Sequence, residues 1–488
     1  MIGIDVGSPS VKAVVADDRG RTLATASSPC AMHHPAAGWA EQDPRDWTQA
    51  LTGAVREART KAGLGRDDVT MLGLACQVDG LVALDARLQV VRPAIIWLDR
   101  RATEQSDAFA NAVGEPAIVG RTGLNPDASH VAPKAMWLRE VEPSNYAATR
   151  WLASAGAYLN GWMTGEVAHD HAHASSTLLY DLGERAWSEE LIAHAGLDPA
   201  RMPAIHPAGT VLGTLRPDVA DALGLSRHCR VITGTGDDHA GALGAGALAP
   251  GVIVDVTGTA EPVAVPSHEA VVDEQRMIES HAHAVDEMLL IENPGFVSGG
   301  STQWWAATQG IPQGELFGLA ALAPPGSDGA LFLPTLSGST APRWNGRMRG
   351  CFAGLALSHD AAHLARAVLE GCAYALRDIV DRFAALELAG EEIRVVGGGA
   401  RSALWLQIKA DVTGRTVRAV LSECATGTGA AMLAGVADGA FRDLGEAADA
   451  SVELAPDPVL PRPLHADTYA EAYAAYRRLF DGVEGSLG

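Results

Sequence analysis

Two short segments of the sequence combine a glycine with hydroxyl side chains directly after an apolar run. The first is Asp5-Val6-Gly7-Ser8-Pro9-Ser10, and the second is Thr257-Gly258-Thr259, which follows Val252-Ile253-Val254-Asp255-Val256. A glycine after a strand permits a tight hairpin whose backbone N–H groups can face an anion, and the hydroxyl groups add donors. Taken alone, the first segment is better explained as an ordinary β-hairpin. The second copy favours two hairpins that clamp a triphosphate between them.

Acidic side chains lie within or near these glycine segments. Asp5 is suited to hold Mg²⁺, directly or through water, because carboxylate oxygens are preferred ligands of this ion. Asp237 and Asp238 follow the turn Gly234-Thr235-Gly236 and precede a stretch rich in alanine and glycine. A carboxylate at a helix start can take the proton of a hydroxyl group, which phosphoryl transfer to an alcohol requires. Helix capping by either residue is the structural alternative, and both interpretations can hold together.

A third glycine run, Gly397-Gly398-Gly399-Ala400, directly follows the apolar strand Ile393 to Val396. Only glycine lets the backbone pass this close to a flat ligand or a phosphate. A tight turn from strand to helix explains the run equally well. The glycine run is therefore a candidate nucleotide contact, and a plain strand-to-helix turn is the other interpretation.

Residues at two other predicted strand ends are candidate sugar contacts. They are Val78-Asp79 and Trp97. Ligands of α/β sheets lie at the carboxyl ends of strands, so Asp79 can accept hydrogen bonds from sugar hydroxyls and Trp97 can stack on a sugar ring. A surface turn and a half-buried tryptophan are the alternatives for each residue alone. The run His169-Asp170-His171-Ala172-His173 lacks a fixed carboxylate or cysteine partner, and we interpret it as a polar loop rather than a metal site.

Composition excludes several classes of protein. The net charge of −22 makes nucleic acids and anionic membranes poor partners. None of the four lysines follows a glycine, so the chain has no Walker A loop, and the signatures of protein kinases are also missing. The six cysteines include no CxxC pair, which fits a reducing cytoplasm. The sequence predicts neither a signal peptide nor a membrane-spanning segment.

The arrangement of predicted elements indicates an α/β protein with two domains. A chain of 488 residues is too long for one hydrophobic core. Short β-rich runs alternate with helical patterns, such as Trp47 to Lys61 and Ala361 to Leu386. The two similar glycine segments each open one half of the chain. This faint repeat predicts domains at residues 1–242 and 243–488.

Together these motifs resemble the FGGY carbohydrate kinase family, and most closely its xylulokinase branch, over nearly the whole chain. Several segments carry the resemblance in the order that the family has. They are Gly3-Ile4-Asp5-Val6-Gly7-Ser8, Trp39-Ala40-Glu41-Gln42-Asp43-Pro44, Ala132-Pro133-Lys134-Ala135-Met136-Trp137-Leu138, Gly350-Cys351-Phe352-Ala353-Gly354-Leu355 and His363-Leu364-Ala365-Arg366-Ala367-Val368-Leu369-Glu370.

The resemblance implies two actin-like, ribonuclease-H-like domains with a deep cleft between them. Residues 1–242 would bind the sugar, and residues 243–488 would bind ATP. Asp237 would be the catalytic base, and Asp5 would lie near the phosphates and Mg²⁺. The ATP contacts would be Gly7, Ser8, Gly258, Thr259, Gly398, Gly399 and Ala400. The residues around the sugar would be Val78, Asp79, Trp97, Asp237 and Asp238.

The expected function is transfer of the γ-phosphate of ATP to a terminal hydroxyl of a ketopentose such as D-xylulose. Some residues depart from the family. Pro9 removes one N–H from the first loop, Val78-Asp79 replaces the Met-His pair typical of xylulokinases, and Asp238-His239 replaces Asn-Ala. A polyol kinase of the erythritol or glycerol type is therefore the first alternative. A non-metabolic ATPase like actin or a chaperone, and a sugar sensor, are the others. We expect a cytoplasmic protein that acts on small molecules, with a homodimer as one option for its assembly.

Overall fold

The predicted β1–β2 hairpin forms the centre of a seven-stranded sheet in the first half of the chain. The structure is a computed structural model, and it describes residues 1–388 and 390–486. The strand order is β13-β14-β5-β1-β2-β3, and β15 also pairs with β5. β1 is antiparallel to β2 and parallel to β5. The strands are β1 (Ile2–Val6), β2 (Ser10–Ala16), β3 (Thr22–Pro29), β5 (Met71–Cys76), β13 (Val211–Thr214), β14 (Arg230–Ile232) and β15 (Thr235–Gly236).

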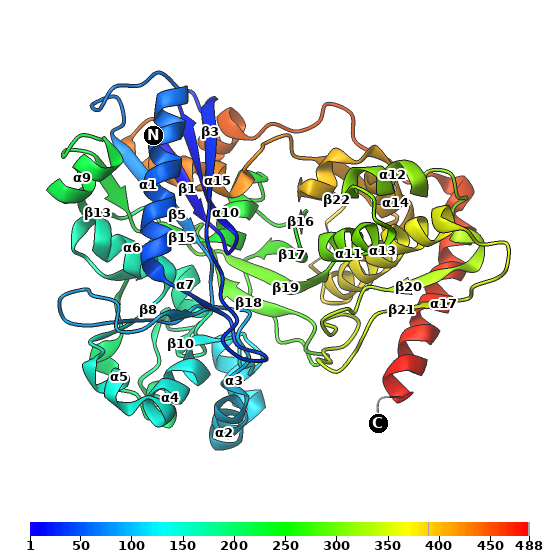
Figure 1. The fold of residues 1–488 in the computed structure, drawn as a ribbon, viewed down its shortest axis with the longest axis horizontal. Coiled ribbons are helices and arrows are strands. Elements are labelled where there is room, and N and C mark those ends of the chain that lie inside the picture. Colours follow the sequence, from blue (N-terminus) through cyan, green and yellow to red (C-terminus); the bar gives the residue numbers. More distant parts are fainter. Residues whose placement is uncertain (389, 487–488) are drawn as a thin grey trace.

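A second sheet repeats this pattern in the other half of the chain. Its order is β18-β19-β17-β16-β22-β23, with β16 antiparallel to β17 and parallel to β22. Each half therefore begins with a hairpin that a parallel strand joins, which is the duplication that the sequence predicts. The strands are β16 (Val252–Thr257), β17 (Ala260–Ser267), β18 (Glu279–Ala282), β19 (Leu289–Val297), β22 (Glu392–Gly397) and β23 (Thr416–Ala419). Figure 1 shows the two halves side by side.

Helices cover the sheets, and local sequence signals explain where they start. α1 (Pro44–Lys61) packs on β2 and β3, and Asp43 caps it by accepting a hydrogen bond from the Arg45 N–H. α13 (Ala361–Ala385) begins with a capping box formed by Asp360 and His363. The other covering helices are α6 (Ala155–Thr164), α9 (Pro217–Leu223), α11 (Gly299–Gln309), α12 (Gln313–Ala320), α14 (Ala403–Thr413), α16 (Leu444–Ser451) and α17 (Ala466–Ser486).

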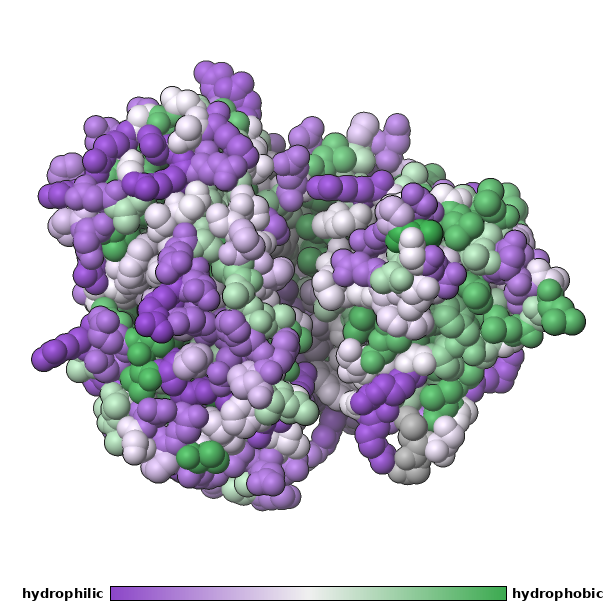
Figure 2. All heavy atoms as spheres, in the orientation of Figure 1, coloured by the Kyte–Doolittle hydropathy of each residue, from purple (hydrophilic) through white to green (hydrophobic). Residues whose placement is uncertain are grey.

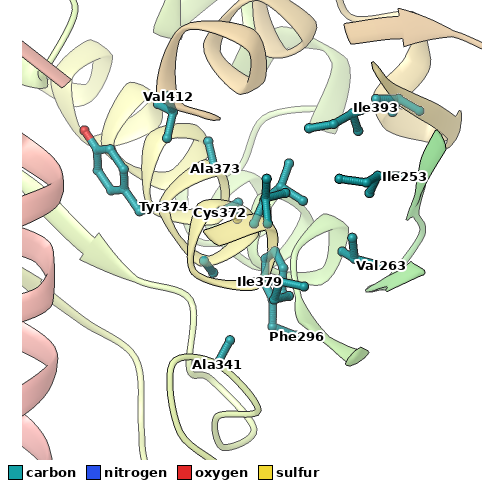
Figure 3. Packing of buried hydrophobic residues seen from close by; sticks show 14 of the residues in the cluster. Ile253, Val263, Phe296, Ala341, Cys372, Ala373, Tyr374, Ile379, Ile393 and Val412 are labelled. Atoms are coloured by element: carbon teal, nitrogen blue, oxygen red, sulfur yellow. The ribbon is translucent and has the colours of Figure 1, made fainter. Parts of the chain in front are cut away.

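The core of the second half lies between its sheet and α13. Figure 3 shows Ile253, Val263 and Ile393 from the strands facing Ile379 of the helix. These side chains are fully buried. Burial of apolar surface is the main favourable term in folding, so this contact fixes the sheet relative to α13.

An additional layer lies beside the first sheet and has its own hydrophobic core. It consists mainly of short helices and strands that connect β5 to β13. They are β6 (Val82–Leu84), β7 (Ala94–Ile95), α2 (Thr103–Val113), α3 (Glu115–Thr122), α4 (Val131–Val141), α5 (Pro143–Ala148), β8 (Trp151–Ala153), β9 (Ala168–Asp170), α7 (His171–Ser175), β10 (Tyr180–Asp181), β11 (Ala186–Trp187), α8 (Glu189–His194) and β12 (Ala204–His206). Two further short pairings use β4 (Glu41–Gln42), with β7, and β20 (Leu331–Leu333) with β21 (Cys351–Ala353).

The histidine run is not the polar loop that the sequence predicts. His169 lies in β9 and His173 in α7, and both side chains are buried. Asp170 caps α7 by accepting the His173 N–H at 3.0 Å, which starts a helix where the sequence reads as a loop. Within residues 1–388 and 390–486, no helix is long and apolar enough to cross a membrane.

Two helices join the halves by direct contact of their backbones. They are α10 (Asp237–Gly244) and α15 (Ala425–Asp438), which returns from the second half to pack on β1 and β5 (Figure 1). A Cβ atom at Gly429 would lie 2.0 Å from the Ala240 carbonyl oxygen, and one at Gly244 would lie 1.9 Å from that of Ala425. Only glycine fits at such distances. The predicted boundary at residue 242 falls within α10 and stays a prediction.

We predict that Gly429→Ala destabilises the protein, because the added methyl group must force α10 and α15 apart. The expected loss in the free energy of unfolding is about 1–3 kcal/mol, as for other overpacked sites. Thermal melting of the purified variant measures the effect. Gly482→Ala in α17 is the matched control, since a Cβ atom there meets nothing within 4 Å. An unchanged melting temperature for Gly429→Ala would contradict the close packing.

Candidate functional site

The first glycine segment forms a closed hairpin whose serine holds a tryptophan. The Gly7 N–H donates to the Ser10 carbonyl at 3.2 Å and so closes the turn. The Ser8 hydroxyl accepts the Trp97 indole N–H at 2.8 Å and donates to the Gln77 side chain at 3.3 Å. The structure therefore brings Ser8 and Trp97 together. Their hydrogen bond fixes the plane of the indole ring, a contact that the sequence does not reveal.

Asp5 lies under this hairpin, in β1, and is buried. Its Oδ2 atom accepts a hydrogen bond from Lys12 Nζ at 3.3 Å and a weak one from the Cys424 thiol at 3.6 Å. Burial raises the pKa of Asp5 above its ordinary value, although the charge of Lys12 works in the opposite direction. Cys424 immediately precedes α15, so Asp5 also contacts the segment that returns from the second half.

Asp237 and Asp238 form the first turn of α10 and are partly buried. Gly236 occupies the N-cap position, so neither aspartate is the N-cap residue of the helix. Burial, followed by the charges of Asp238 and Asp5, raises the pKa of Asp237 well above its ordinary value. Burial and the charges of Asp79 and Asp5 raise the pKa of Asp238 to about 6. Electrostatic interactions therefore connect the predicted base (Asp237), the predicted Mg²⁺ residue (Asp5) and the predicted sugar residues of the first half (Asp79 and Asp238).

The second glycine segment and the glycine run lie against each other. β16 and β22 are parallel, and their register places Thr257 opposite Gly397. A Cβ atom at Gly399 would lie 2.7 Å from the Thr257 side chain, so Gly399 must be glycine to pack there. Gly258 and Thr259 are exposed at the hairpin tip. The predicted turn from strand to helix is observed at the glycine run. Gly398 is exposed there, and Ala400 is half-buried.

The start of α11 supports the tip of the second hairpin. The Gly299 N–H donates to the Gly258 carbonyl at 3.1 Å, and the Gly300 N–H donates to the Thr259 carbonyl at 3.0 Å. A Cβ atom at Gly299 would lie 2.2 Å from the Gly258 carbonyl oxygen, and one at Gly300 would lie 2.7 Å from the Val297 side chain, so a side chain would clash at either position. These two residues belong to the candidate ATP side, although sequence analysis did not select them.

His130 and Lys134 complete the surroundings of Asp79 and were also not selected as site residues. Asp79 has a positive φ of 60°, which is unusual outside glycine. Lys134 Nζ donates to the Asp79 carbonyl at 2.6 Å, and His130 Nδ1 lies 3.1 Å from the Asp79 carboxylate. Burial disfavours the charged form of His130. The charge and the hydrogen bond of Asp79 outweigh this effect and raise the pKa of His130 to about 9. The imidazolium and the carboxylate therefore form an ion pair.

The second half contributes Glu279 and Glu292 to the same region. The β18–β19 hairpin docks on the first half, where the Asn125 N–H donates to Glu279 Oε1 at 2.9 Å. Burial raises the pKa of Glu279 to about 7. Burial and the charges of Asp238, Glu279, Asp79 and Asp237 raise the pKa of Glu292 well above its ordinary value. Polar residues at every second position of Glu279-Ser280-His281-Ala282-His283 were the sequence signal for this buried polar face.

Figure 2 shows a deep groove between the two halves. The strand ends that carry Asp5 and Asp79 and the start of α10 belong to the first half, and the glycine tips at residues 257–259 and 397–399 belong to the second. The fold is thus a duplicated, actin-like one, with the candidate carboxylates in the first half and two glycine segments in the second. The N-terminal domain model of the FGGY family of carbohydrate kinases matches residues 1–244, and the C-terminal domain model matches residues 256–437. The chain belongs to this family.

Known proteins similar to the chain are sugar and polyol kinases that it covers almost completely. It is 31% identical over 478 residues to the xylulose kinase of Escherichia coli K12, covering 98% of this chain and 96% of that one. It is 30% identical over 475 residues to the glycerol kinase of Citrifermentans bemidjiense, with 95% of each covered. The crystal structure of xylulose kinase from Rhodospirillum rubrum superposes with a TM-score of 0.89 at 28% identity, with 99% of each chain covered.

These likenesses confirm the predicted fold class and the predicted class of enzyme. The protein is an ATP-dependent carbohydrate kinase, which decides against the chaperone-like ATPase and the sensor. The individual site roles stay predictions, as does the identity of the sugar.

We predict that Asp79→Asn lowers the pKa of His130 from about 9 to below the ordinary value of 6.5. The substitution removes the negative charge that raises the pKa, and the effect of burial then dominates. Nuclear magnetic resonance titration of labelled histidine measures the shift. Asp127→Asn is a control of smaller effect, because Asp127 is only a minor source of the shift. An unchanged pKa in Asp79→Asn would show that the ion pair does not form.

Proposed function

We propose that the protein transfers the γ-phosphate of ATP to a terminal hydroxyl of a neutral ketopentose, of which D-xylulose is the first candidate. Similarity over the whole length to xylulose kinases supports this acceptor. The alternative is a polyol of the erythritol or glycerol type. It is favoured by Asp79 in place of the usual histidine and by the similarity to a glycerol kinase.

One observation carries the proposal: Asp5 in β1 and Asp237 directly after β15 lie on the two sides of β5, and burial, followed by the charges of Asp238 and Asp5, raises the pKa of Asp237. Asp237 is not the N-cap residue of its helix, and its raised pKa makes it a better acceptor for a hydroxyl proton. In the proposed reaction, Asp237 takes the proton of the acceptor hydroxyl as the oxygen attacks the γ-phosphorus. The bond to the β–γ bridging oxygen breaks, and ADP leaves with that electron pair.

The residues around the phosphates fit Mg²⁺. Asp5 receives both of its recorded hydrogen bonds at Oδ2, and the neighbouring carboxylates of Asp237 and Asp238 are also hard oxygen donors. We assign Asp5 as the holder of the ion, directly or through water. When bound, Mg²⁺ neutralises charge on the phosphates.

The nucleotide is assigned to the second half of the protein. Gly258 and Thr259 are proposed to hold the phosphates from the second hairpin, opposite Gly7 and Ser8. The glycine run at Gly398-Gly399-Ala400 is assigned to the adenosine. Closing the groove would then bring the γ-phosphate to the acceptor and exclude water.

The charges on the acceptor side favour a neutral substrate over a sugar acid. Burial and the charge of Asp79 raise the pKa of Asp238, and burial with the charges of Asp238 and Asp79 raises the pKa of Glu292. An anionic group placed among them adds repulsion in a partly buried space. Hydroxyl groups instead accept from protonated carboxyls and donate to ionised ones. Val78 packs on Gly236 and contributes an apolar wall beside Asp237.

The location and assembly of the enzyme are also proposals. All six cysteines are free, which supports a reducing cytoplasm. A homodimer remains a prediction from the sequence.

We predict that ADP release with ATP and Mg²⁺ is strongest with a ketopentose in a panel of ketopentoses, aldopentoses, polyols and gluconate. Gluconate is expected to have a kcat/KM lower by about 100-fold or more, because like charges cost several kcal/mol at close range. A coupled assay for ADP measures each rate. Highest turnover with erythritol or glycerol would select the polyol alternative. No release with any sugar would overturn the proposed function.

We predict that Asp237→Asn lowers kcat by about 10²–10⁴-fold, the usual contribution of a general base. The wild-type rate is expected to fall with decreasing pH at values well above the ordinary carboxyl range, because the base must be ionised and its pKa is raised. The apparent pKa belongs to Asp237 and Asp238 together. Retained turnover in a folded Asp237→Asn variant would disprove the assignment.

A further inference from the structure

Lys409 of α14 is fully buried beneath the second hairpin and pairs with two carboxylates. Its Nζ atom lies 2.5 Å from Asp255 Oδ2, 3.1 Å from Glu261 Oε1 and 2.7 Å from the Thr257 hydroxyl. Neither Lys409 nor the two carboxylate side chains is exposed to solvent. Burial disfavours the charge of Lys409, but Asp255 and Glu261 raise its pKa above the ordinary value, so it stays an ammonium ion. Its three N–H donors are all used.

The hydroxyl of Thr257 is saturated by the same network. It accepts from Lys409 and donates to Asp255 Oδ1 at 3.0 Å. Its orientation is therefore fixed, and its side chain is the surface on which Gly399 packs. One ammonium group thus determines the position of both the hairpin at residues 257–259 and the glycine run at residues 397–399.

A third segment is attached through Glu261. The Ser298 hydroxyl donates to Glu261 Oε2, and Ser298 immediately precedes Gly299 and Gly300 of α11. The N–H groups of those glycines donate to the hairpin carbonyls of Gly258 and Thr259. The network therefore contacts every backbone segment that forms the candidate ATP side.

Such a network is costly for stability alone. Removing charges from water is expensive, and buried ion pairs are often no more stabilising than apolar residues of the same volume. An apolar side chain at position 409 would fill the space but would leave the Thr257 hydroxyl without its donor and the two buried carboxylates without a counterion. The geometry is better explained as a device that holds three glycine-containing segments in one arrangement.

We propose that Lys409, with Asp255 and Glu261, is a positioning residue for ATP: it fixes the hairpin, the glycine run and the start of α11 so that their backbone matches the nucleotide. This inference rests on the proposed assignment of ATP to the second half. Lys409 is fully buried and does not reach the nucleotide, and the sugar contacts assigned to Asp79, Trp97 and Asp237 belong to the first half of the protein.

The first test is Thr257→Val, which keeps the shape of the side chain and removes both hydrogen bonds. The KM for ATP is expected to rise by about tenfold, the scale of one lost hydrogen bond to a charged group. The KM for the sugar is expected to change by less than about twofold, because the sugar contacts assigned to the first half do not touch the network. Thr257→Ser is the matched control, since it keeps the hydroxyl and is expected to restore the KM for ATP.

Lys409→Met tests the network directly and is expected to raise the KM for ATP at least as much. Thermal melting and calorimetric titration with ATP in the absence of sugar accompany the kinetics. If Lys409→Met does not fold, Thr257→Val decides. An unchanged KM for ATP in Thr257→Val, or an equal rise for ATP and sugar, would overturn the proposal. Absence of sugar-dependent turnover in the wild type would instead refute the proposed function, and the ATP titrations would still test the network.

Discussion

Burial of several carboxyl groups at the junction of the two halves, together with repulsion between them, is the constraint on which the site depends. Asp5, Asp237 and Asp238 follow or end elements of the first sheet, and Glu279 and Glu292 reach them from the second half. Groups of like charge in a partly buried space cannot all stay ionised. The protein responds with raised pKa values, with Lys12 beside Asp5 and with His130 beside Asp79. In the proposed reaction, the acceptor hydroxyl would lose its proton to Asp237 in this environment.

Buried charged groups have different hydrogen-bond partners on the two sides of the groove. On the acceptor side, Glu292 Oε2 is buried without a hydrogen-bond partner. On the ATP side, Lys409 satisfies both neighbouring carboxylates and a hydroxyl at once. Glu292 Oε1 lies 3.2 Å from His281 Nε2, so only Oε2 is left to interact with a polar substrate, whereas the saturated network around Lys409 holds backbone in place. This difference fits the proposal that the acceptor side recognises the sugar, whereas the ATP side binds the same nucleotide in every reaction.

Short sequence patterns correctly predicted those elements of the fold that neighbouring residues determine. The hairpins after β1 and β16, the helix at Asp237 and the duplicated sheet all follow from short patterns of apolar residues, glycine and hydroxyl residues. Contacts between distant segments could not be read in the same way. His130 reaches Asp79 across 51 positions, and Glu279 reaches Asn125 across 154. The histidine run was misinterpreted because the cap provided by Asp170 and the burial of His169 depend on the surrounding fold.

The helix that carries the candidate base belongs to both halves. α10 starts from β15 of the first sheet, contacts β16 of the second, and packs on α15 without intervening side chains. Backbone contacts as close as that at Gly429 leave no room for the two helices to slide over a side chain. This pair therefore holds the start of α10, where Asp237 lies, in a fixed position between the two sheets.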